Sequence, residues 1–260
     1  DGKDEIIFGS LVLNNNGTPR CAILGGHGDA LHASRFSKAT PDVLVYTLHE
    51  SLKSFPGGWA ETLYNPRTCA IVTGLNQNST SDPGRGMIAA FSDSYPGAYM
   101  WAGGGLKGIY DLAGNSANST SPKSTNFAIW WDADLQRELE DANSISKYDM
   151  TNGATNTLLT CSTCLGNNGS KNTPVLLGDI FGDWREEVIW RTSDNASLRI
   201  YTTTLVATNR IPTLFQDPQY RLALAWQNNA YNQPPWPSFY LGPQMNTPPV
   251  PNIVTQASAG

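Results

Sequence analysis

Lys171 stands in a polar, glycine-containing loop shortly before an acidic cluster of Asp179, Asp183, Glu186 and Glu187, and an apolar strand pattern follows at once. All-β repeats often present metal ligands and reactive groups in this way, on loops held by rigid strands. Burial would lower the pKa of the lysine and make it a base, whereas an ion pair would keep it charged and structural. The sequence leaves both alternatives open.

The three histidines of the chain all fall between positions 27 and 49. The segment GGHGDALH contains His27, Asp29 and His32, and the pair His49-Glu50 follows. Mixed imidazole and carboxylate ligands suit a divalent ion, and the many carboxylates elsewhere favour Ca²⁺ over Zn²⁺. His27, Asp29 and Glu50 are therefore candidate metal ligands. The alternative is that each histidine is hydrogen-bonded within a turn.

Two acidic turns resemble calcium loops because their carboxylates lie close together in the sequence. One contains Asp132 and Asp134, and the other contains Asp179 and Asp183 followed by Glu187. Carboxylates this close repel one another unless a cation lies between them. We expect a structural calcium ion chiefly at 179–187. Ordinary solvated turns, in which Asp and Gly are common, are the alternative.

Two other segments carry groups that could bind a sugar acid. Arg85 stands between two glycines in DPGRG, where its guanidinium could form a fork for a carboxylate or remain a solvated loop side chain. The stretch WQNNAYNQPPW places the rings of Trp226, Tyr231 and Trp236 among amides such as Asn232. This composition suits stacking on sugars and hydrogen bonding to their hydroxyls, although aromatic rings are more often core. Trp226 and Asn232 are candidate sugar contacts.

Short strands must position these groups. Five segments share an acidic turn that leads into a strand, at intervals of about 40 to 55 residues, the length of one four-stranded propeller blade. Since one blade cannot bury both of its faces, such repeats predict a ring. The prediction is an all-β fold, with a β-propeller of about five blades over residues 1–242 and a Pro-rich linker over 243–260. The blades could form a ring of five or part of a larger ring.

The pattern of apolar residues gives local assignments within this plan. It predicts strands at 43–46, 70–72, 128–130, 198–201 and 222–226, and one helical turn at 135–140.

Composition narrows the class of protein. Charged residues make up 15% of the chain, the net charge is −5 and the pI is about 5.1, which argues against a nucleic-acid surface. No apolar run is long enough to span a membrane. Because the chain opens on DGKDEIIFGS without a methionine, we expect that its natural N-terminus has been removed.

The cysteines and the glycosylation triplets indicate in which cellular or extracellular compartment the protein works. Cys161 and Cys164 could form a zinc half-site, a redox pair or a disulfide, but Cys21 and Cys69 lack the paired spacing that would complete a zinc site. We expect two disulfides. Together with the Asn-x-Ser/Thr triplets at Asn16, Asn78, Asn118, Asn168 and Asn195, they favour a secreted glycoprotein.

Several motifs in the same order resemble one known family, the rhamnogalacturonan lyases of polysaccharide lyase family 11. They are GHGDALH, DPGRG, WWDADLQRELED, NGSK, DIFGDWREEVIWR, SLRIYTTT, RIPTLFQDPQYRLALAWQNNAYNQPP and FYLG. The resemblance extends to about Gly242. It implies the C-terminal part of an eight-bladed, calcium-binding β-propeller that cleaves rhamnogalacturonan I.

The resemblance also implies roles for particular residues. Arg85, Lys171 and Tyr231 would lie in the active cleft, Asn168, Gly169 and Ser170 would shape it, and His27, Asp29 and Glu50 would bind Ca²⁺. The implied reaction is a β-elimination that leaves a 4,5-unsaturated galacturonate, with Lys171 or Tyr231 as the base. Ala90 and Tyr99 stand where the family has carboxylates, so the blade that contains them is expected to lack its ion.

Other functions are weighed against this one. The main alternative is a calcium-stabilised propeller that binds a pectic glycan without chemistry, and convergence of Lys171 and Arg85 on one cleft would discriminate against it. A glycoside hydrolase is weaker, since no pair of carboxylates stands out as acid and base. The expected partner is the polysaccharide alone, bound by a monomer without nucleic acid or membrane.

Overall fold

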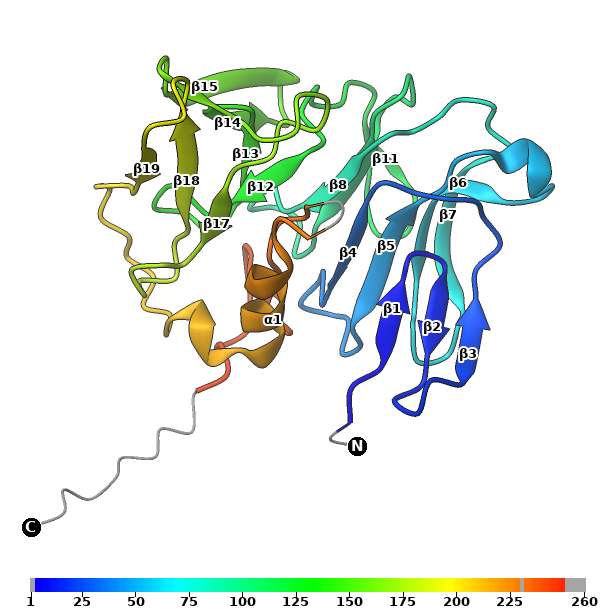
Figure 1. Cartoon of the computed structure of the whole chain (residues 1–260). Helices are drawn as coiled ribbons and strands as arrows, with labels where there is room; N and C mark the ends of the chain where they lie inside the picture. The colour runs from blue at the N-terminus through cyan, green and yellow to red at the C-terminus, as the bar shows by residue number, and fades with distance from the viewer. Residues whose placement is uncertain (1–2, 230–231, 251–260) are drawn as a thin grey trace, which may run out of the picture.

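The structure is a computed structural model that describes residues 3–229 and 232–250. It is an all-β fold of five antiparallel sheets, each formed by consecutive strands of the chain (Figure 1). In Figure 1 the sheets are arranged as a fan, with the first two on the right, the third in the middle and the last two on the left, and helix α1 (Pro218–Trp226) lies on its inner side. No sheet closes on itself within the described residues.

The first two sheets contain the N-terminal third of the chain. The three-stranded sheet runs β1 (Ile6–Phe8), β2 (Leu11–Leu13) and β3 (Pro19–Ala22). The four-stranded sheet that follows runs β4 (Leu31–Ser34), β5 (Leu44–Leu48), β6 (Trp59–Tyr64) and β7 (Ile71–Gln77), with the short helix η1 (Leu52–Ser54) between β5 and β6.

Three further sheets follow, and the first two of them have their strands in sequential order like the sheet before. One runs β8 (Gly86–Ala89), β9 (Tyr99–Ala102), β10 (Ile109–Tyr110) and β11 (Ser116–Asn118). The next runs β12 (Phe127–Ile129), β13 (Glu138–Asp141), β14 (Ser144–Asp149) and β15 (Ala154–Thr160). In the last, β18 (Glu187–Thr192) pairs with β16 (Cys164–Leu165), β17 (Leu176–Gly178) and β19 (Leu198–Tyr201).

Neighbouring sheets pack face to face through separate apolar clusters. Alternate residues of a strand point to opposite faces, so each inner sheet contributes one face to the cluster before it and the other face to the cluster after it. Leu139 packs toward the β8–β11 sheet, whereas Ile129 and Ile145 pack toward the last sheet. The repeated meanders are therefore stacked side by side rather than folded as independent units.

A central cluster joins the sheets to the C-terminal segment. It contains Tyr46, Met100, Trp130, Trp184, Tyr220 and Trp236. Within it, the buried guanidinium of Arg137 lies 3.8 Å from the ring centroid of Trp130 and 4.3 Å from that of Trp236. Arg137 also pairs with buried Glu186 at 3.1 Å, so its charge is compensated. The C-terminal segment thus closes the inner side of the fan.

Most of the expected strands are present. Those expected at 43–46, 70–72, 128–130 and 198–201 fall on β5, β7, β12 and β19.

Two local assignments were wrong. The strand expected at 222–226 lies in helix α1, which starts with a proline after the N-cap Asp217, whose side chain accepts from the N–H of Tyr220. The apolar run LALAW does not distinguish the two structures, and the capping residues decide. The helical turn expected at 135–140 is a turn followed by strand β13.

Both disulfides are present. Cys21 on β3 is joined to Cys69 before β7, and Cys161 is joined to Cys164 between β15 and β16. The zinc and redox-pair alternatives therefore give way to the disulfide prediction. In the described part of the chain, no helix has the length and apolar character needed to cross a membrane.

The segment expected as a linker is described as far as residue 250. Its Gln244 Nε2 donates to the carbonyl of Asp93 at 2.7 Å, and Met245 packs against the central cluster. These described residues therefore lie against the body of the fold.

Candidate active site

A run of glycines lays one loop flat against the end of strand β5. A Cβ on Gly26 would fall 2.2 Å from the carbonyl oxygen of Glu50, and one on Gly28 would fall 1.8 Å from that of Leu48. Only glycine permits this approach of two backbones. The N–H of Glu50 donates to the carbonyl of His27 at 2.6 Å. The sequence GGHGD therefore brings His27 and its neighbours beside Glu50.

His27, Asp29 and Glu50 consequently form one cluster. Each offers a ligand atom that lies within 4.8 Å of the others, and His27 Nε2 is 2.9 Å from Asp29 Oδ1. Burial, followed by the negative charges of Asp82 and Asp29, raises the pKa of Glu50. A divalent cation would relieve this repulsion, and one nitrogen with carboxylate oxygens is a donor set that Ca²⁺ or another divalent ion accepts. The residues fit a metal ion.

Lys171 reaches this cluster from the other end of the chain. Its Nζ donates to Asp29 Oδ2 in an ion pair between residues 142 positions apart. Burial acts to raise the pKa of Asp29, but the hydrogen bonds and charges of Lys171 and His27 outweigh it and hold the pKa below its usual value. Of the two roles left open for Lys171, the structure contains the ion pair.

The loop that carries Lys171 is closed at its base by backbone hydrogen bonds. Asn167 and Thr173 exchange two such bonds, of 2.7 and 3.1 Å. Asn168 adopts a left-handed φ of 53°, and its carbonyl accepts from the N–H of Lys171 at 2.9 Å. Asn168, Gly169 and Ser170 are exposed at the tip of the loop. Their role as substrate contacts stays a prediction.

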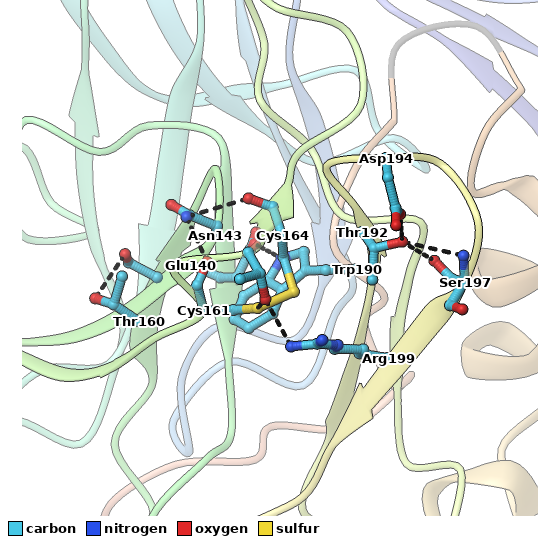
Figure 2. The surroundings of a disulfide bond; sticks show 12 residues. Glu140, Asn143, Thr160, Cys161, Cys164, Trp190, Thr192, Asp194, Ser197 and Arg199 are labelled. Carbon is cyan, nitrogen blue, oxygen red and sulfur yellow. Dashed lines mark hydrogen bonds between the residues drawn. A yellow bond between two sulfur atoms is a disulfide. The ribbon is translucent and has the colours of Figure 1, made fainter.

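The Cys161–Cys164 disulfide lies immediately before this loop (Figure 2). Asn143 Nδ2 donates to the carbonyls of both cysteines, at 2.7 and 3.3 Å. The preceding residue, Ala142, donates its N–H to the carbonyl of Asn172 at 3.0 Å. Both cysteines are buried against Trp190, which Figure 2 shows next to the disulfide. The β13–β14 turn therefore fixes the disulfide and the far side of the Lys171 loop together.

Arg85 is linked to the same region through the 232–233 segment. It is buried, and its Nη2 donates to the carbonyl of Asn232 at 2.5 Å and to that of Asn126 at 3.1 Å. Gln233 Nε2 donates to the carbonyl of Asp29 at 3.1 Å. Arg85 and Lys171 are thus linked indirectly, through the 232–233 segment and Asp29. Their convergence on one cleft, which the lyase hypothesis requires, stays a prediction.

The expected sugar contacts of the C-terminal segment differ in their exposure to solvent. Trp226 ends α1 with 58% of its surface exposed, as a stacking ring requires. Asn232 is buried, and its Nδ2 donates to the carbonyl of Pro174 at 3.4 Å. Trp236 is buried in the central cluster, so its expected place in a surface platform was wrong. Tyr231 lies outside the described residues.

The acidic turn at 179–187 does not gather its carboxylates. Asp179 Oδ2 accepts from the N–H of Leu214 at 2.7 Å, Asp183 pairs with Arg185 at 2.5 Å, and Glu187 accepts from backbone N–H groups. Among the residues that the structure describes, these three do not form a group that could share one ion. The calcium expected there has no support from this geometry.

The turn at 132–138 does gather its carboxylates. Asp132 and Asp134 converge with Glu138, whose ligand atom lies within 4.8 Å of theirs. Glu138 was not predicted as a ligand because 135–140 was expected to form a helical turn. The spacing Asp-x-Asp-x-x-x-Glu before a strand was the signal that could have revealed it.

Two hollows of the surface lie away from Lys171. One, of about 320 Å³, is bounded by Trp131, Asp132 and the 202–205 segment, and the other, of about 290 Å³, by Asp93, Asp134 and Gln244 among others. Since neither contains Asp29 or Lys171, the chemistry of the site is better located by its converging charges than by these hollows.

The fold and the site together define a class of protein: an all-β protein with a combined lysine and candidate cation site. The family model for the C-terminal domain of rhamnogalacturonan lyase family 11 matches residues 1–251. The chain belongs to this family.

Individual relatives agree with this assignment. The chain is 46% identical over 255 residues to the rhamnogalacturonan endolyase YesW of Bacillus subtilis (strain 168), covering 98% of this chain and 40% of that protein. It is 42% identical over 272 residues to the exolyase YesX of the same organism, covering 99% of this chain and 44% of that protein. The chain thus spans about two-fifths of the length of the curated relatives it matches.

Solved structures give the same relationship. The crystal structure of YesW matches with a TM-score of 0.91 at 45% identity, covering 98% of this chain and 42% of that one. The PL11 rhamnogalacturonan lyase of Bacillus licheniformis matches with a TM-score of 0.91 at 46% identity, with the same coverage of 98% and 42%.

Proposed function

We propose that this chain forms part of a rhamnogalacturonan lyase that cleaves the backbone of rhamnogalacturonan I by β-elimination. The observation that carries the proposal is the contact of Lys171 with Asp29 inside the His27–Asp29–Glu50 cluster. The names of YesW and YesX, an endolyase and an exolyase of rhamnogalacturonan, support the same substrate. Neither mode of cleavage is favoured by this geometry.

We propose that the five sheets are consecutive blades of a β-propeller larger than five. Ile7 of β1 packs toward the second sheet, so Ile6 and Phe8, exposed by 55% and 77%, point to the opposite face. Tyr201 of β19 packs inward in the same way, and Leu198 and Ile200 are exposed by 61% and 52% on the opposite face. Apolar outer faces on both end sheets are what further blades would cover.

In the proposed reaction the C5–H bond and the bond from C4 to the sugar oxygen break, and a C4–C5 double bond forms. Ca²⁺ held by His27, Asp29 and Glu50 would neutralise the uronate carboxylate and so acidify the C5 proton. Because Lys171 is ion-paired with Asp29, it would have to lose its own proton before it took the one from C5. A base in this position contributes about 10²–10⁴-fold to the rate. Tyr231 is the alternative base, or the group that protonates the departing oxygen.

Arg85 has a positioning role in this proposal as well as a charge. Its hydrogen bond to Asn232 holds the segment that follows Tyr231, and Gln233 ties the same segment to Asp29. The positive charges of Arg85 and Lys171 also provide a local cationic patch in a chain of net charge −5, which must bind a polyanion. The two disulfides support secretion, since such bonds persist in oxidising compartments.

A second function is favoured by the contacts of Lys171 and Arg85. Lys171 is ion-paired and Arg85 donates to main-chain carbonyls, which are arrangements that a glycan-binding propeller without chemistry could also have. Ultraviolet absorbance of the unsaturated uronate distinguishes the two. The lyase proposal predicts a rise with rhamnogalacturonan I that Lys171→Ala abolishes and that Lys123→Ala, a change at an exposed lysine, retains. Binding of the polysaccharide without any rise would establish the second function instead.

A further inference from the structure

The acidic turn between β12 and β13 contains a cation of its own. Lys147 of strand β14 directs its Nζ between three carboxylates, at 2.5 Å from Asp132 Oδ2, 2.6 Å from Asp134 Oδ2 and 3.0 Å from Glu138 Oε1. Lys147 lies next to Ser146, which pairs with Leu139 of the neighbouring strand. The register of the β13–β14 hairpin therefore delivers the ammonium group to the turn.

The three carboxylates are hydrogen-bonded on both of their oxygens. Asp132 Oδ1 accepts from the N–H of Asp134 at 2.9 Å, and Asp134 Oδ1 accepts from the N–H of Gln136 at 2.7 Å. Glu138 Oε2 accepts from the N–H of Trp131 at 3.0 Å. One oxygen of each carboxylate thus shapes the turn and the other faces Lys147. An ammonium group has three donors, so each of its N–H bonds has one carboxylate partner.

This arrangement occupies the position that a divalent ion would need. Calcium contacts its oxygen ligands at about 2.3–2.6 Å, close to the distances at which Lys147 lies from the two aspartates. An ion at the centre of these three oxygens would collide with the Lys147 ammonium and repel its charge. The residues that the sequence predicts as calcium ligands, Asp132 and Asp134, therefore do not fit a metal ion while Lys147 remains in place.

We propose that Lys147 replaces a divalent cation at the 132–138 turn, and that removing its charge creates a metal site there. The structural need is the same for an ion or for an ammonium group: three carboxylates, with Glu138 fully buried, require a compensating positive charge. Two other acidic positions have a single arginine partner, at the surface rather than inside a carboxylate cluster. Arg67 pairs with Asp42 at 2.8 Å, and Arg185 pairs with Asp183 at 2.5 Å.

The test counts bound ions rather than activity. We compare the unchanged protein with Lys147→Met, which keeps side-chain length and removes the charge, and with Lys123→Met as the matched control at an exposed lysine. Calorimetric titration with Ca²⁺ and luminescence of bound Tb³⁺ give the stoichiometry. Lys147→Met is expected to bind one more ion than the unchanged protein, and its melting temperature is expected to rise further on addition of Ca²⁺. Lys123→Met is expected to match the unchanged protein in both readouts.

Asp134→Asn provides an independent arm that does not require Lys147→Met to fold. Asp134 is partly exposed, with 40% of its side chain accessible, and the amide preserves its shape. In the unchanged background this substitution is expected to leave the ion count as it is, whereas combined with Lys147→Met it is expected to abolish the additional ion. Loss of an ion from Asp134→Asn alone, or no gain in a folded Lys147→Met protein, would overturn the proposal.

Discussion

The Cys21–Cys69 disulfide is predicted to contribute more to stability, and the Cys161–Cys164 disulfide is predicted to contribute more to catalysis. Cys161–Cys164 precedes the loop that carries Lys171 and is held by hydrogen bonds from Asn143. Cys21–Cys69 joins β3 to the start of β7 at the other end of the fan. Replacing each pair by serines separates a positioning effect on the Lys171 loop from a general loss of stability.

The magnitudes follow from the lengths of the closed loops. The cysteines are separated by 48 residues in Cys21–Cys69 and by 3 residues in Cys161–Cys164. Loop-closure entropy gives about 4 kcal/mol of stabilisation for the longer loop and about 2 kcal/mol for the shorter one. Cys21→Ser/Cys69→Ser should therefore lower the free energy of unfolding more than Cys161→Ser/Cys164→Ser does.

Catalysis should show the reverse order. Without its disulfide the 161–164 turn would hold the 166–173 loop less firmly, so Lys171 would leave the Asp29 contact more often. We expect Cys161→Ser/Cys164→Ser to lose about tenfold in lyase rate, which corresponds to an increase of about 1.4 kcal/mol in the activation free energy. The Cys21→Ser/Cys69→Ser variant is expected to retain the rate of the unchanged protein while it is folded.

Urea unfolding measures the stability of each variant. Initial lyase rates, measured where each variant is fully folded, then show whether the Cys161–Cys164 disulfide positions Lys171. If both variants lost activity in proportion to their loss of stability, the disulfide would not position Lys171. An unchanged rate in Cys161→Ser/Cys164→Ser would refute the reasoning in the same way.

Three further predictions concern single residues. Burial lowers the pKa of His32 from 6.5 to about 3, so between these pH values only the unfolded chain binds the proton. The free energy of unfolding should therefore fall by up to about 5 kcal/mol as the pH decreases from 6.5 to about 3. Denaturant titrations of His32→Gln should lack this part of the pH dependence. Gly28→Ala would place a Cβ 1.8 Å from the carbonyl of Leu48, so calorimetry should show a loss of Ca²⁺ affinity, and unchanged affinity would contradict the proposed ligand set. Arg85→Lys keeps the charge but loses the planar fork that holds Asn232, so steady-state kinetics should show a lower lyase rate with unchanged Ca²⁺ affinity; equal rates would show that charge alone suffices.

The local parts of the site could be predicted from the sequence because they depend on neighbouring residues. The glycines at 25–28 reveal a loop with close backbone contacts, and His27 and Asp29 stand within it. Glu50 follows the strand on which that loop lies. Such short-range information is enough to predict that His27, Asp29 and Glu50 lie together, as they do in the structure.

The long-range parts could not be predicted from pattern alone. The contact between Lys171 and Asp29 joins residues 142 positions apart, and it depends on how the last sheet and the second sheet close around the central cluster. Trp236 belongs to a stretch whose composition suits a sugar platform, yet tertiary packing against Arg137 buries it. Burial of a ring is decided by what packs on it, which composition does not state.

The acidic turns show a third limit. Spacing alone indicates that Asp132 and Asp134 lie close together, but the positive charge that compensates them comes from Lys147 on the following hairpin strand. A carboxylate pattern therefore predicts that a cation is needed, and only the strand register decides whether that cation is an ion or a side chain.

The central claim is that the protein breaks rhamnogalacturonan I by elimination, with no water added. The most direct test is to let it act on the polysaccharide and to analyse the products by mass spectrometry. Elimination predicts products that carry an unsaturated galacturonate end. Saturated products, heavier by one water for each cleaved bond, would establish hydrolysis and contradict the account.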